Sequence, residues 1–291
     1  MSDEKHDYAD GMLAYNRFVQ PALEQALAHV DRQLATDGHT RILDAGCGPG
    51  GAFPLFFETF GEDTTVVAVD NSEPHLEAAR ERVRRLELEE TVSLERCDLA
   101  DGLSTGREPF DVLWFSNVLF FFDDPIATLS SFTELLRPGG VVAVFYGGWD
   151  RAAFLPGNPH LEALVYQARM AGLDRCPSDW RDREGTAHPE RAPKWLTAAG
   201  FESVRHDVLP VTYRRDARGD LDEGVRQYLE QRFSEIVDDS MLEHGRSLGL
   251  SEADIEQILA LLDPERDTYV LDQPGYLCHI PTLLTTGVSS R

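Results

Sequence analysis

The sequence predicts an α/β protein with a doubly wound, mostly parallel sheet. Two observations predict this class. Short β-branched segments alternate with amphipathic helical segments through the first half of the chain. A glycine-rich segment follows directly after the first of the expected strands. With 291 residues, the chain is long enough to bury a core without disulfides or a metal ion.

The first expected elements are a helix, a strand and a second helix. Apolar residues recur at spacings of three to five over residues 11–35, which predicts a helix that Pro21 divides into two pieces. Residues 41–45 form a short apolar segment that ends in glycines, as expected of a strand that leads into a turn. A helix at 54–60 is expected to end at Gly61.

The alternation continues to residue 146. Buried or alternating segments predict strands and charged amphipathic segments predict helices, in the order strand 65–70, helix 74–88, strand 92–98, strand 110–116, helix 125–136 and strand 141–146. The turn Arg137-Pro138-Gly139-Gly140 is expected to stop the last helix. Helical crossovers join parallel strands, so these five strands imply the parallel sheet.

After Gly148 the alternation fails. The following residues are rich in Pro, Gly, Trp and Arg, and later residues return to helix and strand patterns. The expected elements are helix 158–171, helix 190–199, strand 201–214, helices near 219–237 and 251–262, and an extended stretch at 268–286. We expect a single domain, 1–291, with core segments 36–148, 190–214 and 268–288 and cap segments 1–35, 149–189 and 215–267.

The composition restricts the partners. The chain carries 27 basic against 51 acidic residues, a net charge of -24, which argues against nucleic acid and against an anionic membrane surface. The longest apolar run, 112–122, is too short to span a bilayer, and the first ten residues are polar and acidic. The four cysteines lack zinc-site spacing, so we expect free thiols, no metal and a cytoplasmic location. The acidity is consistent with salt adaptation or with a GC-rich genome, and the oligomeric state is not indicated.

The glycine-rich segment, residues 43–51, carries two overlapping fingerprints. One is the G-x-G-x-x-G loop of dinucleotide sites, and the other is an acidic-x-G-x-G-x-G loop that begins at Asp44. Asp44 separates these interpretations, because a carboxylate at a strand end repels a pyrophosphate and suits a ligand with an ammonium group. Pro49 also removes an N–H that a pyrophosphate would use.

With these segments, the sequence resembles a class I S-adenosylmethionine-dependent methyltransferase of the ubiquinone/menaquinone-methyltransferase-like type, over residues 40–147. Besides the glycine loop, the matching segments are Val69-Asp70-Asn71-Ser72, Leu76-Glu77-Ala78-Ala79, Cys97-Asp98-Leu99, Phe110-Asp111-Val112-Leu113, Ser116-Asn117 and Leu135-Leu136-Arg137-Pro138-Gly139-Gly140. The resemblance implies a Rossmann-like, seven-stranded, mostly parallel sheet with helical cap insertions. It also implies S-adenosylmethionine as cofactor and S-adenosylhomocysteine as product.

The resemblance implies roles for residues at the strand ends. Asp44 would orient the amino group of the cofactor, and Asp70 would accept hydrogen bonds from both ribose hydroxyls. Asp98 would accept from the adenine amino group. The implied cofactor-binding residues are Asp44, Gly46, Cys47, Gly48, Gly50, Asp70, Asn71, Asp98, Leu99 and Asn117. Simpler roles stay open for two of them: Asp98 as a turn cap and Asn117 as a strand terminator.

The substrate side departs from the family pattern. Related enzymes often have Val-Leu-His-His after the fourth strand, whereas this chain has the apolar segment 118–122 and no histidine base there. Asn71 and His75 stand where the family often has an apolar residue and Met, so adenine stacking is expected to differ. The expected substrate-binding residues are Tyr15, Phe121, Tyr146 and Trp149. No catalytic residue is assigned; candidates by position are His160, Asp123 and Tyr146.

The leading hypothesis is methyl transfer to O, N or C of a small molecule by in-line displacement. Orientation and desolvation are the main tasks of the protein in such a reaction. One alternative is a protein that binds S-adenosylmethionine but catalyses another reaction or regulates a partner. Another is a nicotinamide dehydrogenase that uses the G-x-G-x-x-G pattern.

Overall fold

The computed structural model describes residues 3–34, 38–103, 108–147, 152–155, 159–164, 166, 189–215, 223–247 and 249–290. Side chains are described from residue 11 onward, apart from 239–241 and 244. The contacts divide the chain into two compact units. The first unit comprises residues 1–147, 185–209 and 282–291, and the second comprises 148–184 and 210–281.

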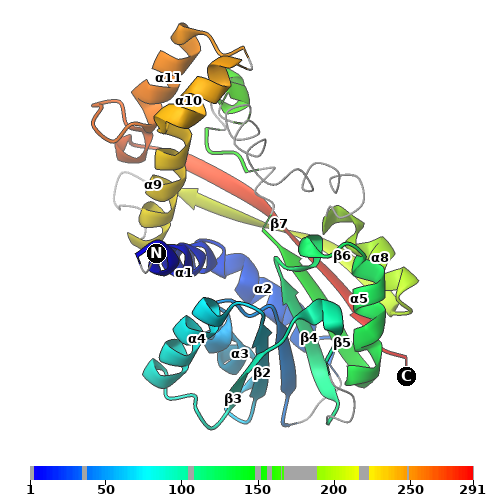
Figure 1. The fold of residues 1–291 in the computed structure, drawn as a ribbon. Coiled ribbons are helices and arrows are strands. Elements are labelled where there is room, and N and C mark those ends of the chain that lie inside the picture. The colour runs from blue at the N-terminus through cyan, green and yellow to red at the C-terminus, as the bar shows by residue number, and fades with distance from the viewer. Residues whose placement is uncertain are drawn as a thin grey trace. The chain divides into compact units, whose positions relative to one another are not determined.

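A seven-stranded sheet organises the fold (Figure 1). Its strands are β1 (Arg41–Ala45), β2 (Thr65–Asp70), β3 (Val92–Arg96), β4 (Phe110–Ser116), β5 (Leu136–Tyr146), β6 (Glu202–Arg214) and β7 (Leu277–Val288). They lie in the order β3-β2-β1-β4-β5-β7-β6. The first five strands pair in parallel and β7 is antiparallel to β5, which confirms the seven-stranded, mostly parallel sheet. The strand order reverses between β1 and β4, where open α/β sheets bind ligands.

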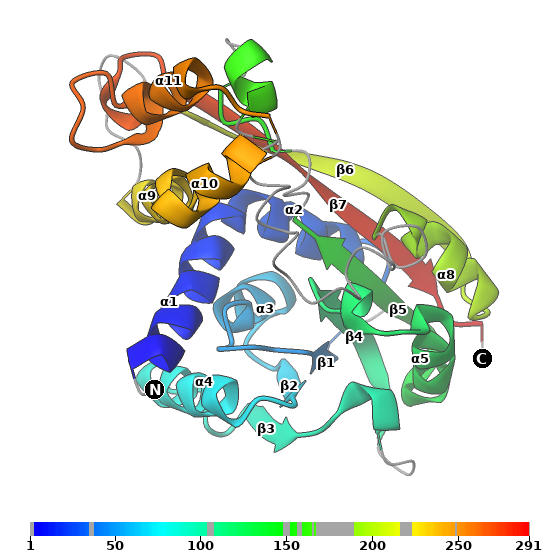
Figure 2. The same ribbon diagram turned by 45° about the horizontal axis from the view of Figure 1, so that its top comes forward.

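Helices of the first unit cover both faces of the sheet (Figure 2). The helices α1 (Asp3–Phe18), α2 (Gln20–Asp31), α3 (Phe53–Phe60) and α4 (Glu73–Arg85) lie on one face, and α5 (Pro125–Phe132) and α8 (Ala192–Ala198) lie on the other. The predicted break near Pro21 is confirmed, because α1 ends at Phe18 and α2 begins at Gln20. Gly61 ends α3 with φ 95°, as predicted.

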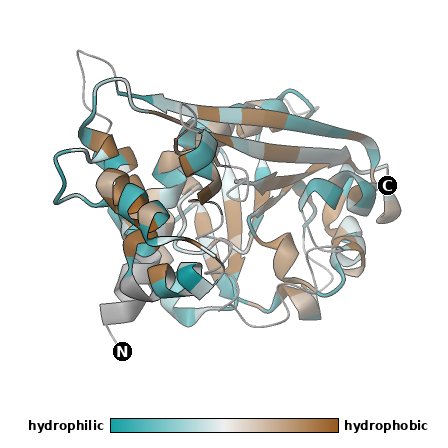
Figure 3. Ribbon diagram, turned by 90° about the horizontal axis from the view of Figure 1, so that it is seen from above, coloured by the Kyte–Doolittle hydropathy of each residue, from teal (hydrophilic) through white to brown (hydrophobic). Residues whose placement is uncertain are grey.

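The central strands form the core of the first unit. Residues 110–115 of β4 are buried throughout, and Figure 3 shows the central strands as predominantly hydrophobic. Trp114 lies between two rings, edge-on to Phe56 at 6.1 Å and stacked on Phe145 at 6.0 Å. Since one residue of β4 links α3 to β5 in this way, the strand that carries part of the site is held rigidly.

The junction between α5 and β5 corrects the sequence prediction. The helix expected to reach residue 136 ends at Phe132, and a 3₁₀ turn follows over Thr133–Leu135. Strand β5 then begins at Leu136 instead of at 141. The expected turn at 137–140 is a bulge within this strand, because Pro138 has no N–H to pair and Gly139 has φ 78°.

The second unit is mainly helical where it is described. It contains α9 (Glu223–Val237), α10 (Asp239–Ser247) and α11 (Glu252–Leu262). The sequence predicted α9 and α11 and missed α10, which follows α9 after a single residue and is joined to α11 by residues 248–251. Phe233 of α9 packs edge-on against Phe154 at 5.7 Å and Tyr269 at 6.5 Å.

Two other expectations for this unit are modified. The stretch 268–286 is not extended throughout, because a 3₁₀ turn occupies Val270–Asp272 before β7 begins. Of the expected helix 158–171, residues 159–164 and 166 are helical and the rest lie outside the described residues. In the described part of the chain, no helix has the length and hydropathy needed to cross a membrane.

Candidate functional site

The glycine loop after β1 is folded against the end of β2. The N–H groups of Gly46 and Cys47 donate to the carbonyl of Val69 at 2.8 and 3.0 Å, and the Gly48 N–H donates to a carboxylate oxygen of Asp70 at 2.9 Å. Gly46, Gly48 and Gly50 have φ values of 80°, 53° and 76°. This left-handed conformation is costly for other residues, which explains the alternating glycines.

Asp44 is a carboxylate in the interior of the first unit. It is the fourth residue of β1 and only 2% exposed. Burial, and secondarily the charge of Asp70, raise the pKa of Asp44 to about 8. The group is therefore mostly protonated at neutral pH, and a cation placed beside it would favour its ionised form. A buried acid of this kind fits a ligand that brings its own positive charge.

Asp70, at the end of β2, has the opposite character. Burial alone would raise the pKa of Asp70, but hydrogen bonds from His75, Ser72 and Gly48 outweigh it and hold the pKa below its ordinary value. One carboxylate oxygen accepts from the Ser72 N–H at 2.9 Å and faces His75 Nδ1 at 3.3 Å. The other accepts from the Gly48 N–H. A carboxylate has about four acceptor positions, so three are filled and one is left for a ligand.

Residues at the end of β3 border the same region. Asp98 is exposed and accepts a hydrogen bond from the Ala100 N–H at 3.0 Å, so it caps the 3₁₀ turn Leu99–Asp101. This is the simpler of the two roles considered for Asp98, and it leaves the second carboxylate oxygen available. The side chain of Leu99 is buried beneath the turn.

Asn117 connects three segments at the end of β4. Its φ is 54°, a left-handed conformation that Asn tolerates better than most residues. The side-chain amide donates to the hydroxyl of Tyr15 at 3.1 Å and its oxygen accepts from the Gly147 N–H at 3.0 Å. Asn117 therefore ends the strand, as the simpler interpretation held, and also joins α1 to the end of β5.

These strand ends surround a cavity of about 570 Å³. The predicted cofactor residues that line it are Asp44, Gly46, Cys47, Asp70, Asn71, Asp98, Leu99 and Asn117. Gly48 and Gly50 lie outside the lining; Gly48 instead braces Asp70. Asp44, Asp70 and Asp98 lie at the ends of the strands β1, β2 and β3, whereas the apolar residues Val118, Phe121 and Phe122 follow β4, as does a fourth lining carboxylate, Asp123.

Similarity to known proteins agrees with this geometry. A family model described as a methyltransferase domain matches residues 36–178. A methyltransferase from Schizosaccharomyces pombe, itself uncharacterised, is 31% identical over 219 residues, which cover 67% of this chain and 76% of that protein. The chain belongs to the methyltransferase family. S-adenosylmethionine is the methyl donor of this family, as the sequence resemblance implied.

Other relatives of this methyltransferase act on different acceptors. The ubiquinone biosynthesis O-methyltransferase of Dinoroseobacter shibae is 30% identical over 165 residues, which are 56% of this chain and 60% of that enzyme's length. The tRNA 5-carboxymethoxyuridine methyltransferase of Escherichia coli is 29% identical over 189 residues, covering 62% of this chain and 70% of that enzyme. The family therefore does not by itself identify the acceptor of this methyltransferase.

The predicted substrate residues of the methyltransferase divide into three groups. Tyr15 and Phe121 line the cavity. Tyr146 is not in the lining and packs edge-on against Phe120 at 5.7 Å. Trp149 lies outside the described residues.

The candidate bases also differ in position. Asp123 lines the cavity and is exposed. His160 belongs to the second unit and does not line the cavity; its side chain is 67% exposed and 3.9 Å from Asp254. Cys47 lines the cavity, but burial raises the pKa of its thiol, which keeps it neutral and poorly nucleophilic.

The sequence interpretation missed the contribution of α1 beyond Tyr15. Met12 and Asn16 also line the cavity, and these three residues follow the i, i+3, i+4 spacing of one helix face. Each of them also packs against a glycine so closely that a Cβ atom there would overlap it. A Cβ on Gly48 would lie 2.8 Å from Met12, one on Gly147 would lie 1.7 Å from Tyr15, and one on Gly51 would lie 1.6 Å from Asn16. The helical spacing was visible in the sequence, whereas its glycine partners were not.

Gly147→Ala is expected to destabilise the first unit by about 1–3 kcal/mol, because the added carbon overlaps the Tyr15 hydroxyl. The same overlap disrupts the hydrogen bond from the Asn117 amide to the Tyr15 hydroxyl. Tyr15→Phe removes that hydroxyl, so the double variant should be less destabilised than the sum of the two single variants. Urea denaturation of all four proteins measures this coupling. Strictly additive changes would show that α1 does not dock as described.

Proposed function

We propose that this methyltransferase transfers the methyl group of S-adenosylmethionine to a small apolar molecule. The observation that carries the proposal is the division of one cavity into an acidic side, with Asp44 and Asp70, and an apolar side, with Val118, Phe121 and Phe122. The acidic side suits a cationic cofactor, and the apolar side suits the acceptor.

The residues of the acidic side fit the cofactor. The ammonium group of the cofactor would be the positively charged partner that stabilises the ionised form of the buried Asp44. The one open acceptor position of Asp70 suits a ribose hydroxyl, and a bond to both hydroxyls requires His75 to move away. Asp98 would accept from the adenine amino group with its free oxygen. When bound, the cofactor supplies a methyl group on a positively charged sulfur.

The remaining residues of the site would position the acceptor and exclude water. Phe121 lines the cavity and is 53% exposed although its ring packs against Phe120 at 4.4 Å, so it would present apolar surface to an acceptor. Asn117 and Tyr15 both line the cavity and are held together by their hydrogen bond. If the acceptor must lose a proton, Asp123 would accept it, because it is the one of the three predicted bases that lines the cavity.

Charge supports a small molecule over tRNA as the acceptor. The chain has a net charge of -24, and Asp70, Asp98 and Asp123 all border the cavity. Phosphate groups of a nucleic acid would be repelled on approach, because such binding depends on neutralising phosphates with basic side chains.

The test uses the purified full chain and S-adenosylmethionine labelled on the methyl group. The acceptors are a panel of apolar phenols, amines and carbon nucleophiles, with unmodified tRNA as a separate arm. We expect label in at least one small organic product and none in the tRNA. Label in tRNA alone would overturn the proposal. Binding of S-adenosylhomocysteine without transfer to any acceptor would favour a non-methylating role.

Phe121→Ala is expected to raise the KM for an apolar acceptor by roughly tenfold, because a buried Phe contributes about 1.5–3 kcal/mol and an acceptor covers only part of the ring. The affinity for S-adenosylhomocysteine should stay within about twofold, which separates this effect from cofactor binding. Phe121→Leu keeps apolar area and is the matched control. Equal KM values for the Ala variant and the unmodified enzyme would remove Phe121 from the acceptor site.

A further inference from the structure

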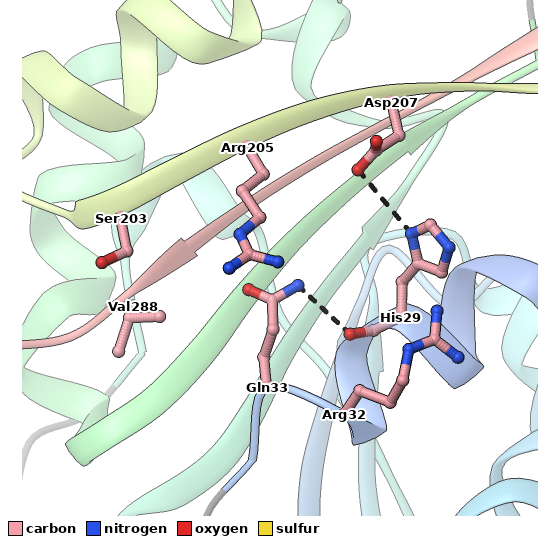
Figure 4. Close-up of a pocket in the computed structure, with 7 residues that line it drawn as sticks. All are labelled: His29, Arg32, Gln33, Ser203, Arg205, Asp207 and Val288. Atoms are coloured by element: carbon pink, nitrogen blue, oxygen red, sulfur yellow. Dashed lines mark hydrogen bonds and ion pairs between the residues drawn. The ribbon is translucent and has the colours of Figure 1, made fainter.

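A second cavity of the first unit lies between the end of α2 and the edge strand β6. It has a volume of about 510 Å³ and is lined by His29, Arg32, Gln33, Ser203, Arg205, Asp207 and Val288. We call it the α2–β6 cavity (Figure 4). It shares no lining residue with the cavity at the strand ends. Methyl transfer as proposed above does not use it.

The walls of the α2–β6 cavity are held by regular structure. Arg205 and Asp207 occupy alternate positions of β6, so their side chains share one face of the strand, and Ser203, whose φ of 50° departs from strand geometry, also lines the cavity. Opposite them, the Gln33 amide donates to the Thr286 hydroxyl of β7 at 3.0 Å and to the His29 carbonyl at 3.1 Å. Both amide hydrogens are therefore used to fasten the end of α2 to the sheet, which leaves Gln33 as a fixed wall.

Two guanidinium groups face this cavity without an acidic partner. In the part of the chain that the structure describes, Arg32 and Arg205 form no ion pair or hydrogen bond through their side chains. Figure 4 shows Arg205 extending from β6 toward Gln33 and Arg32 extending from the end of α2 beside His29. Among the described residues of the lining, Asp207 is the one carboxylate, and it lies 3.6 Å from His29 Nδ1 and so already faces a base.

The two arginines bring positive charge to one place in an acidic chain. With 51 acidic residues against 27 basic ones, the molecule as a whole repels anions, and a basic side chain has many possible partners. Arg80, Arg232 and Arg246, for example, all pair with a glutamate of their own or a neighbouring segment. Two unpaired guanidinium groups at one cavity therefore provide a local site for an anion.

We propose that the α2–β6 cavity binds a small molecule that carries a phosphate group. Guanidinium groups present parallel N–H donors that match the oxygens of phosphate, and two of them suit its double charge. The hydroxyl of Ser203, which lines the same cavity, adds a further donor. The cavity volume lies within the range of about 300–1,000 Å³ typical of small-molecule sites. It accommodates an organic group in addition to the phosphate, so a phosphomonoester fits better than the bare anion.

The test is calorimetric titration of the full chain with methyl phosphate and, separately, with inorganic phosphate. Sodium chloride keeps the ionic strength constant in all titrations, because screening alone alters a protein of this charge. We expect saturable binding of one methyl phosphate per chain, at least as tight as that of inorganic phosphate. Arg205→Gln and Arg32→Gln should each weaken it by about tenfold or more.

Arg84→Gln is the matched control, because it removes the same charge from an exposed position of α4 outside the cavity. Its affinity for methyl phosphate should stay within about twofold of the unmodified protein. Arg32 and Arg205 are exposed, so both variants should fold, and thermal unfolding verifies this. No saturable binding of either probe up to about 10 mM, or an equal loss in all three variants, would overturn the proposal. Tighter binding of inorganic phosphate than of the ester would overturn the choice of a phosphomonoester.

Discussion

Replacing Asp70 with alanine is expected to weaken the binding of S-adenosylhomocysteine by about a hundredfold or more. A hydrogen bond to a charged group contributes about 1.5–3 kcal/mol, so the loss of one ribose contact alone accounts for about ten- to a hundredfold. The same substitution removes the acceptor of the Gly48 and Ser72 N–H groups. The glycine loop would then lose its connection to β2, which adds to the loss of affinity.

Two further variants separate these contributions. Glu73→Ala removes an exposed carboxylate that lies three residues along the chain and pairs with Arg80, so cofactor affinity should not change. Asp70→Asn keeps one acceptor oxygen but loses the charge, and an intermediate affinity is expected. Isothermal titration with S-adenosylhomocysteine measures all three. An Asp70→Ala protein that is folded and binds as well as the unmodified enzyme would contradict the assignment of Asp70 to the ribose.

The affinity for S-adenosylhomocysteine is expected to rise by about tenfold between pH 6 and pH 7 and by about fivefold between pH 7 and pH 8. Burial, and then Asp70, raise the pKa of Asp44 to about 8 in the absence of ligand. The ammonium group of the ligand binds the ionised form, so below this pKa binding must release a proton. The effect should level off as the pH approaches 8. Titrations in two buffers of different ionisation enthalpy measure the number of protons released.

Asp44→Asn removes this ionisation and is expected to make the affinity nearly independent of pH over the same range. At pH 8 its affinity should be lower by about a hundredfold, since a charge-assisted bond to the ammonium group is lost. A steep pH dependence that persists in Asp44→Asn would assign the proton to another group.

The same substitution should increase stability without ligand. The pKa of an unfolded Asp is about 3.9, so between pH 4 and pH 8 the folded state of the unmodified protein binds more protons than the unfolded state. The stability of the unmodified protein therefore falls as the pH rises from 4 to 8. Asp44→Asn lacks the ionisable group, so its stability has no such dependence. Urea denaturation at pH 5 and pH 8 should show the advantage of the variant increasing with pH. If the difference in stability between Asp44→Asn and the unmodified protein were the same at both pH values, Asp44 would be in a more solvated environment than described.

The sequence predicted the residues whose role depends on strand ends. Asp44 and Asp70 each end a β-branched or apolar segment, and parallel strands bring such ends to one edge of the sheet. Their proximity could therefore be expected from the order of elements alone. Their different electrostatic character could not, because it depends on three donors that approach Asp70 from Gly48, Ser72 and His75.

Residues that act through contacts distant in the sequence were less predictable. The hydrogen bond of Asn117 to Tyr15 spans 102 residues, and no local pattern indicates it. The early start of β5 depends on a bulge, whereas the residues at 138–140 alone indicate a turn. Arg32 and Arg205 were unremarkable in the sequence, because their common cavity arises only when the end of α2 packs beside β6.

The position of β7 also constrains the order in which the sheet is assembled during synthesis. β7 is the last of the seven strands along the chain, yet it lies in the interior of the sheet, between β5 and β6. A chain that emerges from the ribosome N-terminus first presents the five parallel strands early, and β6 then has no neighbour in the sheet to pair with. The sheet stays in two pieces until residues 277–288 have been made. During that interval the unpaired edges of β5 and β6 are exposed, which makes this the stage of biogenesis at which chaperones would be most useful.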